Sequence, residues 1–152
     1  MVAVVPFTRE RISDVLAFER ELRRQEPDTF FMDAGESYRD LLERSFEDSR
    51  FTNAVSMLAL EDGRVIGRGD AVILAARSDA SCSTAYLDWI CVLKEERHRG
   101  VAQLLLQELR RALKERGVET LIAIMAHNPE SVRFYNAIEN ASVHDEAVWM
   151  DL

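Results

Sequence analysis

The segment from Val92 to Ala102 combines small residues with basic ones in a way that suits binding of a phosphorylated ligand. Arg97 and Arg99 place positive charge there in an otherwise acidic chain. If a helix begins at Gly100, its first backbone N–H groups and the positive end of its dipole would face an anion. Gly100 and Ala102 lack bulk, so the anion can approach the backbone. The segment therefore predicts a phosphate cradle, although a plain helix start with exposed basic side chains gives the same pattern.

The residues on either side of this segment predict the elements that would hold it in place. Residues 85–92 form a largely apolar run typical of a strand, and apolar positions then recur at helical spacing over 100–116. Gly117 is a natural cap for that helix, and 118–126 is typical of a buried strand. A strand–helix–strand crossover of this kind binds ligands at the carboxyl end of its first strand.

The rest of the chain predicts an antiparallel meander flanked by helices. Asp62-Gly63 is a strong hairpin turn, because both central positions of a type I′ turn need a positive φ. The other expected elements are strands at 2–5, 54–60, 65–76 and 147–152, and helices at 9–24, around 38–46 and from Asn128-Pro129. The fold class is therefore α/β, with a mixed sheet in which the meander leads into the crossover.

The length and net charge of the chain limit the classes of protein to which it can belong. A chain of 152 residues suits one domain, 1–152, with one hydrophobic core. A net charge of −8 argues against binding to nucleic acid or to an anionic membrane surface. The start of the chain lacks the features of a signal peptide, and no apolar run is long enough to span a bilayer. Cys82 and Cys91 lack metal-site spacing, so we expect reduced thiols, no metal and a cytoplasmic location.

Two motifs resemble those of the GNAT superfamily of N-acetyltransferases. That family has a strand ending in Val and, five residues later, the pattern Arg/Gln-x-x-Gly-x-Gly/Ala; here these are Val92 and 97–102. Its second motif is Asn followed seven residues later by Tyr, here Asn128 and Tyr135. The resemblance covers the whole chain in element order. It implies a GNAT-like fold and acetyl-CoA as co-substrate.

The resemblance also implies roles for individual residues. Tyr135 would be the general acid that protonates the departing CoA thiolate, and Asn128 would hydrogen-bond the cofactor arm. The remaining cofactor contacts would come from Ile90, Cys91 and Val92 for the pantetheine arm, and from Arg97, His98, Arg99, Gly100, Val101, Ala102 and Gln103 for the pyrophosphate. Simpler alternatives stay open: Asn128 before Pro129 is an ordinary helix cap, Tyr135 could be a core aromatic, and Arg97 could pair with Glu95 or Glu96.

The general base is not provided by the resemblance. Some relatives carry a catalytic Glu where this chain has Ala123, and others where it has Tyr86. An amine with a pKa near ~10 must lose a proton before it attacks, so a base or a water chain is needed. Asp88 is our candidate, since it shares a face with Tyr86 if no bulge intervenes. His127 is a second candidate and His98 a remote third.

Three further positions depart from the family pattern. A proline often stands two residues after the strand-ending valine, where this chain has Lys94. The Leu-Gly-Phe that usually follows the tyrosine helix is absent, but Asn140 can adopt the left-handed conformation of that glycine. The C-terminal strand region is short, which leaves the acceptor side either open or completed by a second chain in a homodimer.

The acceptor is expected to enter beside the loop 25–33. Its carboxylates Asp28 and Asp33, with Phe30 and Phe31, would suit a cationic amine with an apolar body, although a solvated loop with buried phenylalanines explains them equally well. The sequence thus predicts transfer of an acetyl group from acetyl-CoA to a primary amine of a small molecule or peptide, directly in a ternary complex. The alternatives are a CoA-binding sensor or partner module without turnover, and an unrelated phosphate-ligand binder.

Overall fold

The computed structural model describes residues 1–30 and 34–152, so the predictions for Phe31 and Asp33 lie outside the described residues. The described chain divides into two compact units, Met1–Ile122 and Ala123–Leu152. No helix within the described residues has the length and apolar character needed to cross a bilayer.

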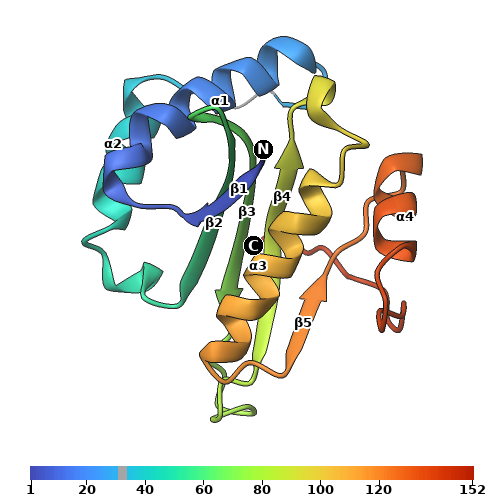
Figure 1. The fold of residues 1–152 in the computed structure, drawn as a ribbon. Helices are drawn as coiled ribbons and strands as arrows, with labels where there is room; N and C mark the ends of the chain where they lie inside the picture. Colours follow the sequence, from blue (N-terminus) through green and yellow to red (C-terminus); the bar gives the residue numbers. More distant parts are fainter. Residues whose placement is uncertain (31–33) are drawn as a thin grey trace. The chain divides into compact units, whose positions relative to one another are not determined.

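The first unit holds the sheet and the helices that cover it (Figure 1). The strands are β1 (Ala3–Pro6), β2 (Ala54–Glu61), β3 (Arg64–Ile73), β4 (Thr84–Val92) and β5 (Thr120–Ala123), whose last residue begins the second unit. The helices are α1 (Ile12–Gln25), α2 (Glu36–Ser45) and α3 (Val101–Glu115), with 3-10 turns η1 (Arg9–Arg11), η2 (Ser49–Phe51) and η3 (Lys94–Glu96). The strand order is β1-β2-β3-β4-β5, and β1 to β4 pair antiparallel, as the predicted meander requires.

Helices pack on both faces of this sheet (Figure 1). Buried side chains of α1, among them Leu16, Phe18 and Leu22, form one core cluster with Leu58 of β2. Burying a side chain of this size contributes about 1.5–3 kcal/mol, so this cluster fixes α1 on the sheet. On α3, Leu105 and Leu109 are fully buried, and they contact β3 at two glycines.

The structure confirms a left-handed backbone conformation at three places where the sequence predicted one. Asp62 and Gly63 have φ of 50° and 80°, as the type I′ hairpin turn requires. Gly117, which follows the C-cap residue Arg116 of α3, has φ of 84°, and Asn140 has φ of 61°, the left-handed conformation expected of it. Each of these positions depends on residues within one turn of the chain, which explains why the sequence alone predicts it.

The predicted final strand at 147–152 is wrong. The segment has no regular secondary structure, and Trp149 is 81% exposed, with Val148 and Met150 similarly open. A strand needs a neighbour for its backbone hydrogen bonds and a face that buries its side chains, and apolar composition supplies neither. The preceding strand is also shorter than predicted, because β5 ends at Ala123 rather than at residue 126.

Glu19, which interrupts the apolar stripe of α1, is buried in a polar cluster. Its carboxylate accepts hydrogen bonds from Arg23 at 2.9 Å and from Arg68 of β3 at 3.2 Å. Arg68 also donates to the hydroxyl of Tyr38 on α2 at 2.9 Å. The charge is therefore compensated, and the cluster joins α1, α2 and the sheet.

Candidate functional site

The predicted phosphate cradle lies at the junction of β4 and α3. After the 3-10 turn η3, His98 has φ of 60° and Gly100 has φ of 79°, and this pair of left-handed residues turns the chain into α3. The backbone N–H of Leu104 donates to Gly100 O at 3.0 Å. This is the first hydrogen bond of the helix. The N–H groups of residues 101–103 come before it, so they have no acceptor within the helix.

The shape of this turn fits a phosphate group. Gly100 is exposed, and a Cβ added to it would find nothing within 4 Å, so the space in front of the backbone is open. Ala102 is partly buried and Gln103 is exposed. An anion placed here would meet both the N–H donors and the positive end of the α3 dipole.

The carboxyl-terminal half of β4 presents backbone donors on its outer side. Leu93 N–H donates to Ile66 O of β3 at 3.0 Å. In an antiparallel ladder successive N–H groups point to opposite sides, so the N–H groups of Val92 and Ile90 point away from β3. They are oriented as a pantetheine arm paired with the strand would require. Val92 itself is buried and Ile90 is half-buried.

Cys91 lies between these residues and is poorly suited to covalent chemistry. Its side chain is 9% exposed, and burial raises the pKa of its thiol to about 12. A thiol with this pKa is protonated at neutral pH and is a weak nucleophile. The structure therefore gives no support to an acyl-carrier role for Cys91. The same alternation turns its backbone N–H toward Arg68 of β3, so the predicted backbone contact of Cys91 with the pantetheine arm is not supported either.

The arginines of the loop are held by carboxylates. Arg97 donates from Nε to Val92 O at 3.1 Å and from Nη1 to Glu26 Oε1 at 3.0 Å, while its second terminal nitrogen contacts the other Glu26 oxygen. The predicted ion pair thus exists, but its partner is Glu26 rather than Glu95 or Glu96. Sequence reasoning missed Glu26 because it lies 71 residues from Arg97.

Arg99 is exposed and lies among acidic side chains. It donates from Nη2 to Glu61 Oε1 at 2.9 Å and contacts Glu96. The hydrogen bond and charge of Glu61 raise the pKa of its guanidinium above the ordinary value. Arg99 therefore stays charged, and a phosphate at the cradle would compete with these carboxylates for it.

Asp88 occupies a bulge in β4. Asp70 of β3 pairs with Trp89, and the next residue, Ala71, pairs with Leu87, so Asp88 is the extra residue. The sequence predicts Asp88 on the same face of the strand as Tyr86 only if no bulge lies between them. This bulge breaks the alternation of side chains, so that expectation is not met. Asp88 is exposed at this irregularity and remains a candidate base.

Two partly buried aromatic residues lie beside this bulge. Phe30, from the predicted acceptor loop, packs edge-to-face on Trp89 with ring centroids 5.6 Å apart. Asp28 of the same loop is exposed. Trp89 was not among the predicted site residues, since a tryptophan in a strand is ordinarily a core residue. The contact brings Phe30 of the acceptor loop against β4.

The second motif lies in the second unit, on α4 (Pro129–Asn136). Asn128 caps this helix, because its Oδ1 accepts a hydrogen bond from Ser131 N–H at 2.9 Å. The cap alternative for Asn128 is thus confirmed. Tyr135 is partly buried and packs edge-to-face on Phe134 at 5.0 Å. His127 is exposed.

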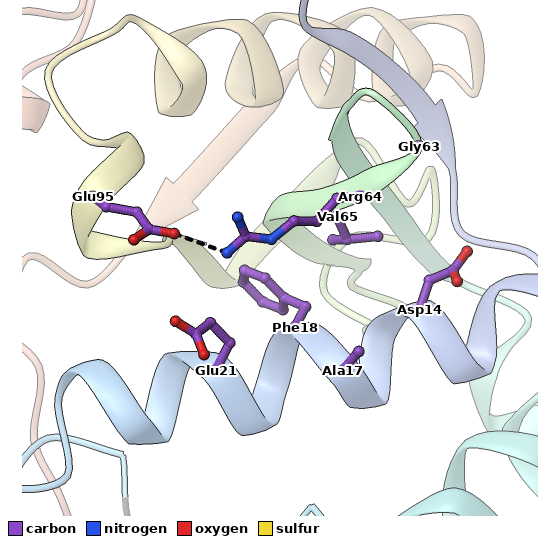
Figure 2. Close-up of a pocket in the computed structure, with 8 residues that line it drawn as sticks. All are labelled: Asp14, Ala17, Phe18, Glu21, Gly63, Arg64, Val65 and Glu95. Carbon is purple, nitrogen blue, oxygen red and sulfur yellow. Dashed lines mark hydrogen bonds and ion pairs between the residues drawn. The ribbon is translucent and has the colours of Figure 1, made fainter.

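A separate open groove of about 540 Å³ lies between α1 and the β2–β3 hairpin (Figure 2). Phe18 and Val65 form its apolar part, and Arg64 crosses it to pair with Glu95 at 2.8 Å. None of the predicted site residues lines it. Within residues 1–30 and 34–152, no group of three His, Cys, Asp or Glu side chains is arranged to hold a metal ion.

The mixed sheet, with an open helix start after its bulged strand, defines an α/β protein. A family model described as "Acetyltransferase (GNAT) family" matches residues 16–138, and the chain belongs to this family. The resemblance seen in the sequence is thereby confirmed.

Several solved structures with the same fold are acetyltransferases of low sequence identity. An aminoglycoside acetyltransferase from an uncultured soil metagenomic sample is 19% identical, with a TM-score of 0.77 over 100% of this chain and 97% of that one. AAC(6')-Iy in complex with the bisubstrate analog CoA-S-monomethyl-acetylneamine is 19% identical, with a TM-score of 0.73 over 100% and 99%. Ribosomal-protein-alanine N-acetyltransferase from Brucella melitensis biovar Abortus 2308 is 18% identical, with a TM-score of 0.71 over 99% of both chains. A comparison with curated protein sequences gave no match.

Proposed function

We propose that this chain is an N-acetyltransferase that moves the acetyl group of acetyl-CoA to a primary amine of a small molecule or peptide. The observation that carries the proposal is the open first turn of α3, where the N–H groups of 101–103 follow the left-handed Gly100. Membership of the GNAT family supports acetyl transfer as the reaction. We further propose that residues 1–152 act as one acetyltransferase domain, which the family match across both units supports.

Acetyl-CoA would be bound mainly by backbone groups. Its pyrophosphate would occupy the cradle of Arg97, His98, Arg99, Gly100, Val101, Ala102 and Gln103, and its pantetheine arm would pair with Ile90 and Val92, on either side of Cys91. The outward N–H groups of Ile90 and Val92 support this arrangement, since they are not used by β3. Asn128 can serve the cofactor arm as well as its helix, because only its carbonyl oxygen is engaged by Ser131 and its amide N–H donors are separate.

Direct transfer needs a polarised thioester, a proton for the leaving thiolate and a base for the amine. We assign the first role to the Val92 N–H and the second to Tyr135. Asp88 is the proposed base, with His127 as the second candidate. The high pKa of Cys91 supports transfer without a protein nucleophile.

The acceptor is proposed to be a cationic amine with an apolar body. Exposed Asp28, and the aromatic pair that Phe30 of the acceptor loop forms with Trp89 of β4, support this choice, since an amine attracts both carboxylate and ring faces. Related folds include one enzyme described as acting on aminoglycosides and one on a ribosomal-protein alanine, so both small-molecule and peptide amines belong in the test.

We also propose a cytoplasmic location and a homodimer. The location is supported by the two free cysteines, Cys82 and Cys91, which a reducing compartment would keep as thiols. The dimer is supported by the exposed apolar side chains of Val148, Trp149 and Met150, which a second chain could cover. Light scattering after size-exclusion chromatography should give twice the mass of one chain. A monomer at micromolar concentration would contradict the dimer.

The activity is tested by release of free CoA thiol from acetyl-CoA in the presence of a panel of amines. The panel should hold polyamines, aminoglycosides and peptides with a free N-terminus or lysine. Amine-dependent thiol release that requires Tyr135 would support the proposal, whereas tight CoA binding without release on any amine would favour the alternative, a CoA-binding sensor. Ala123 and Tyr86, which stand where relatives carry a catalytic Glu, are the observation behind that alternative.

A further inference from the structure

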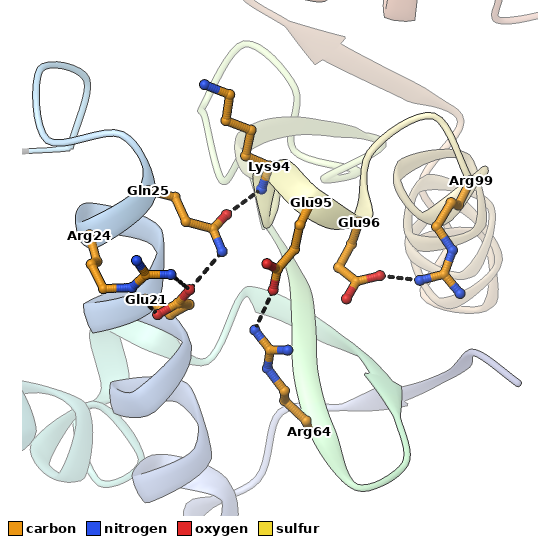
Figure 3. A network of polar contacts seen from close by, with 8 residues as sticks. All are labelled: Glu21, Arg24, Gln25, Arg64, Lys94, Glu95, Glu96 and Arg99. Carbon is orange, nitrogen blue, oxygen red and sulfur yellow. Dashed lines mark hydrogen bonds and ion pairs between the residues drawn. The ribbon is translucent and has the colours of Figure 1, made fainter.

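The last residue of α1 and the C-cap residue after it hold the two ends of the 3-10 turn that leads into the cradle. Gln25, the last residue of α1, accepts through Oε1 a hydrogen bond of 2.7 Å from the backbone N–H of Lys94, where η3 begins (Figure 3). Glu26, the next residue, forms a two-point ion pair with Arg97, where η3 ends. We call these four residues, Gln25, Glu26, Lys94 and Arg97, the α1 latch.

The hydrogen bond from Lys94 is specific to a chain without proline at this position. The family pattern often has proline two residues after the strand-ending valine, and proline has no backbone N–H to donate. Gln25 is oriented to receive the bond, because its Nε2 donates to Glu21 Oε1 at 2.7 Å and its Oε1 therefore faces Lys94. The carboxylate of Glu21 is itself bound by Arg24 (Figure 3).

Arg97 completes the latch from the other end of the turn. Its guanidinium joins Glu26 to the carbonyl of Val92, the last residue of β4. Both side chains of the ion pair are mostly buried, and a two-point pair between guanidinium and carboxylate fixes geometry as well as charge. The Arg97 side chain thus holds the loop that forms the cradle.

We infer that Gln25 and Glu26 are positioning residues that hold η3 and the start of α3 in the conformation that binds CoA. The inference rests on the proposed function. The cradle binds through backbone N–H groups, so its affinity depends on how well its backbone is fixed before the ligand arrives. Gln25 and Glu26 are also the first residues of the acceptor loop 25–33, so they join the cofactor side of the site to the acceptor side.

The test compares two substitutions at one position. Lys94→Pro removes both the side-chain ammonium and the N–H, whereas Lys94→Ala removes the ammonium alone. Leu93 has φ of −50° and ψ of 138°, a conformation that a residue before proline adopts without strain. The Lys94 side chain is exposed, so neither change leaves a cavity.

Isothermal titration with CoA should give a Kd about fivefold higher for Lys94→Pro than for Lys94→Ala, since one hydrogen bond is lost. Gln25→Ala should show a similar rise, and adding Lys94→Pro to it should cause no further loss, because both changes remove the same bond. If Lys94→Pro does not fold, Gln25→Ala against wild type carries the test.

Equal Kd values for Lys94→Pro and Lys94→Ala, or losses that add in the double variant, would overturn the latch while leaving the proposed function intact. A wild-type chain that binds no CoA would instead overturn the proposed function, and the latch with it.

Discussion

Glu19 of α1 and Arg68 of β3 form an ion pair of 3.2 Å in which the two side chains are only 6% and 12% exposed. Asp70 lies 2.6 Å from the other side of the same guanidinium. Burial lowers the pKa of Arg68, but the charge of Asp70 and the contacts with Tyr38 and Glu19 more than offset that effect and raise it. Arg68 therefore remains charged at every accessible pH. It neutralises Asp70 on its own strand and joins Glu19 of α1 to the sheet.

Replacing Arg68 should destabilise the protein strongly. Arg68→Met keeps much of the side-chain volume but leaves Glu19 and Asp70 without their shared cation. Breaking a buried pair in this way typically costs about 3–5 kcal/mol, so the urea midpoint should fall clearly. Arg111→Met, which removes two exposed ion pairs on α3, is the matched control and should leave the midpoint unchanged. Similar midpoints for both variants would show that the buried cluster adds no stability.

Alanine substitutions at two glycines of β3 should separate a loss of folding stability from a loss of CoA affinity. A Cβ at Gly67 would lie 3.0 Å from Leu105 Cδ1, 3.2 Å from Cys91 O and 3.3 Å from Val101, the first residue of α3. Gly67→Ala should therefore shift the start of α3, lower stability by about 1–3 kcal/mol and weaken CoA binding.

Gly69→Ala is the control for that substitution. Its Cβ would meet the Leu109 side chain at 2.7 Å, farther along α3 from the cradle. It should lower the unfolding midpoint but leave the Kd for CoA within twofold of wild type. Equal loss of CoA affinity in both variants would contradict a link between Gly67 and the cradle.

The thiol of Cys91 should be inert at neutral pH. Its pKa of about 12 predicts that iodoacetamide labels Cys82 and spares Cys91, and that Cys91→Ala keeps the acetyl-transfer rate. The thiol has a higher pKa in the folded state than in the unfolded state, so the folded state holds its proton more tightly. This contribution to stability is fully present below about pH 9, where the unfolded thiol begins to ionise, and it is lost as the pH rises toward 12. The urea midpoint of wild type should consequently fall more steeply above about pH 9 than that of Cys91→Ala. Loss of turnover in Cys91→Ala would reopen a covalent mechanism.

Tyr135→Phe should reduce turnover with little effect on substrate binding. Phenylalanine keeps the edge-to-face contact with Phe134 but cannot donate a proton. General acid catalysis contributes roughly 10²–10⁴-fold, so kcat should drop by at least about a hundredfold while KM for acetyl-CoA changes little. The basic limb of the pH–rate profile should change as well. An unaltered kcat would remove Tyr135 from the mechanism and leave it as a packing residue.

The base can be assigned by comparing pH–rate profiles. Asp88→Asn should lower kcat at neutral pH and move the acidic limb, because the amide cannot accept the proton of the amine. His127→Gln tests the second candidate in the same assay. An unchanged profile in Asp88→Asn would discard Asp88 and leave it as the exposed residue of the bulge.

The structural features that the sequence predicted correctly are determined by residues close to one another along the chain. The hairpin at Asp62-Gly63, the start of α3 after Gly100 and the cap at Asn128 each follow from side chains within one turn of the chain. Helical periodicity likewise locates α1 and α3, because an amphipathic face repeats every few residues.

What the sequence did not predict depends on distant partners. Arg97 pairs with Glu26 across 71 residues, and the bulge at Asp88 arises from the register between β3 and β4. Glu19 interrupts an apolar stripe for a reason that only the position of Arg68 explains. The expected strand at 147–152 failed in the same way, since composition cannot say whether a neighbouring strand is present to pair with it.

The central claim, that the start of α3 binds CoA, is tested most directly by thermal unfolding with acetyl-CoA, CoA and ATP at matched, near-saturating concentrations. A ligand at a hundred times its Kd stabilises the folded state by about 2.7 kcal/mol, which raises the Tm of a domain of this size by roughly 5–10 °C. We predict such a rise with acetyl-CoA and with CoA, and little with ATP. No shift with either CoA species on folded protein would contradict the account, and a shift with ATP alone would indicate an unrelated phosphate-ligand binder.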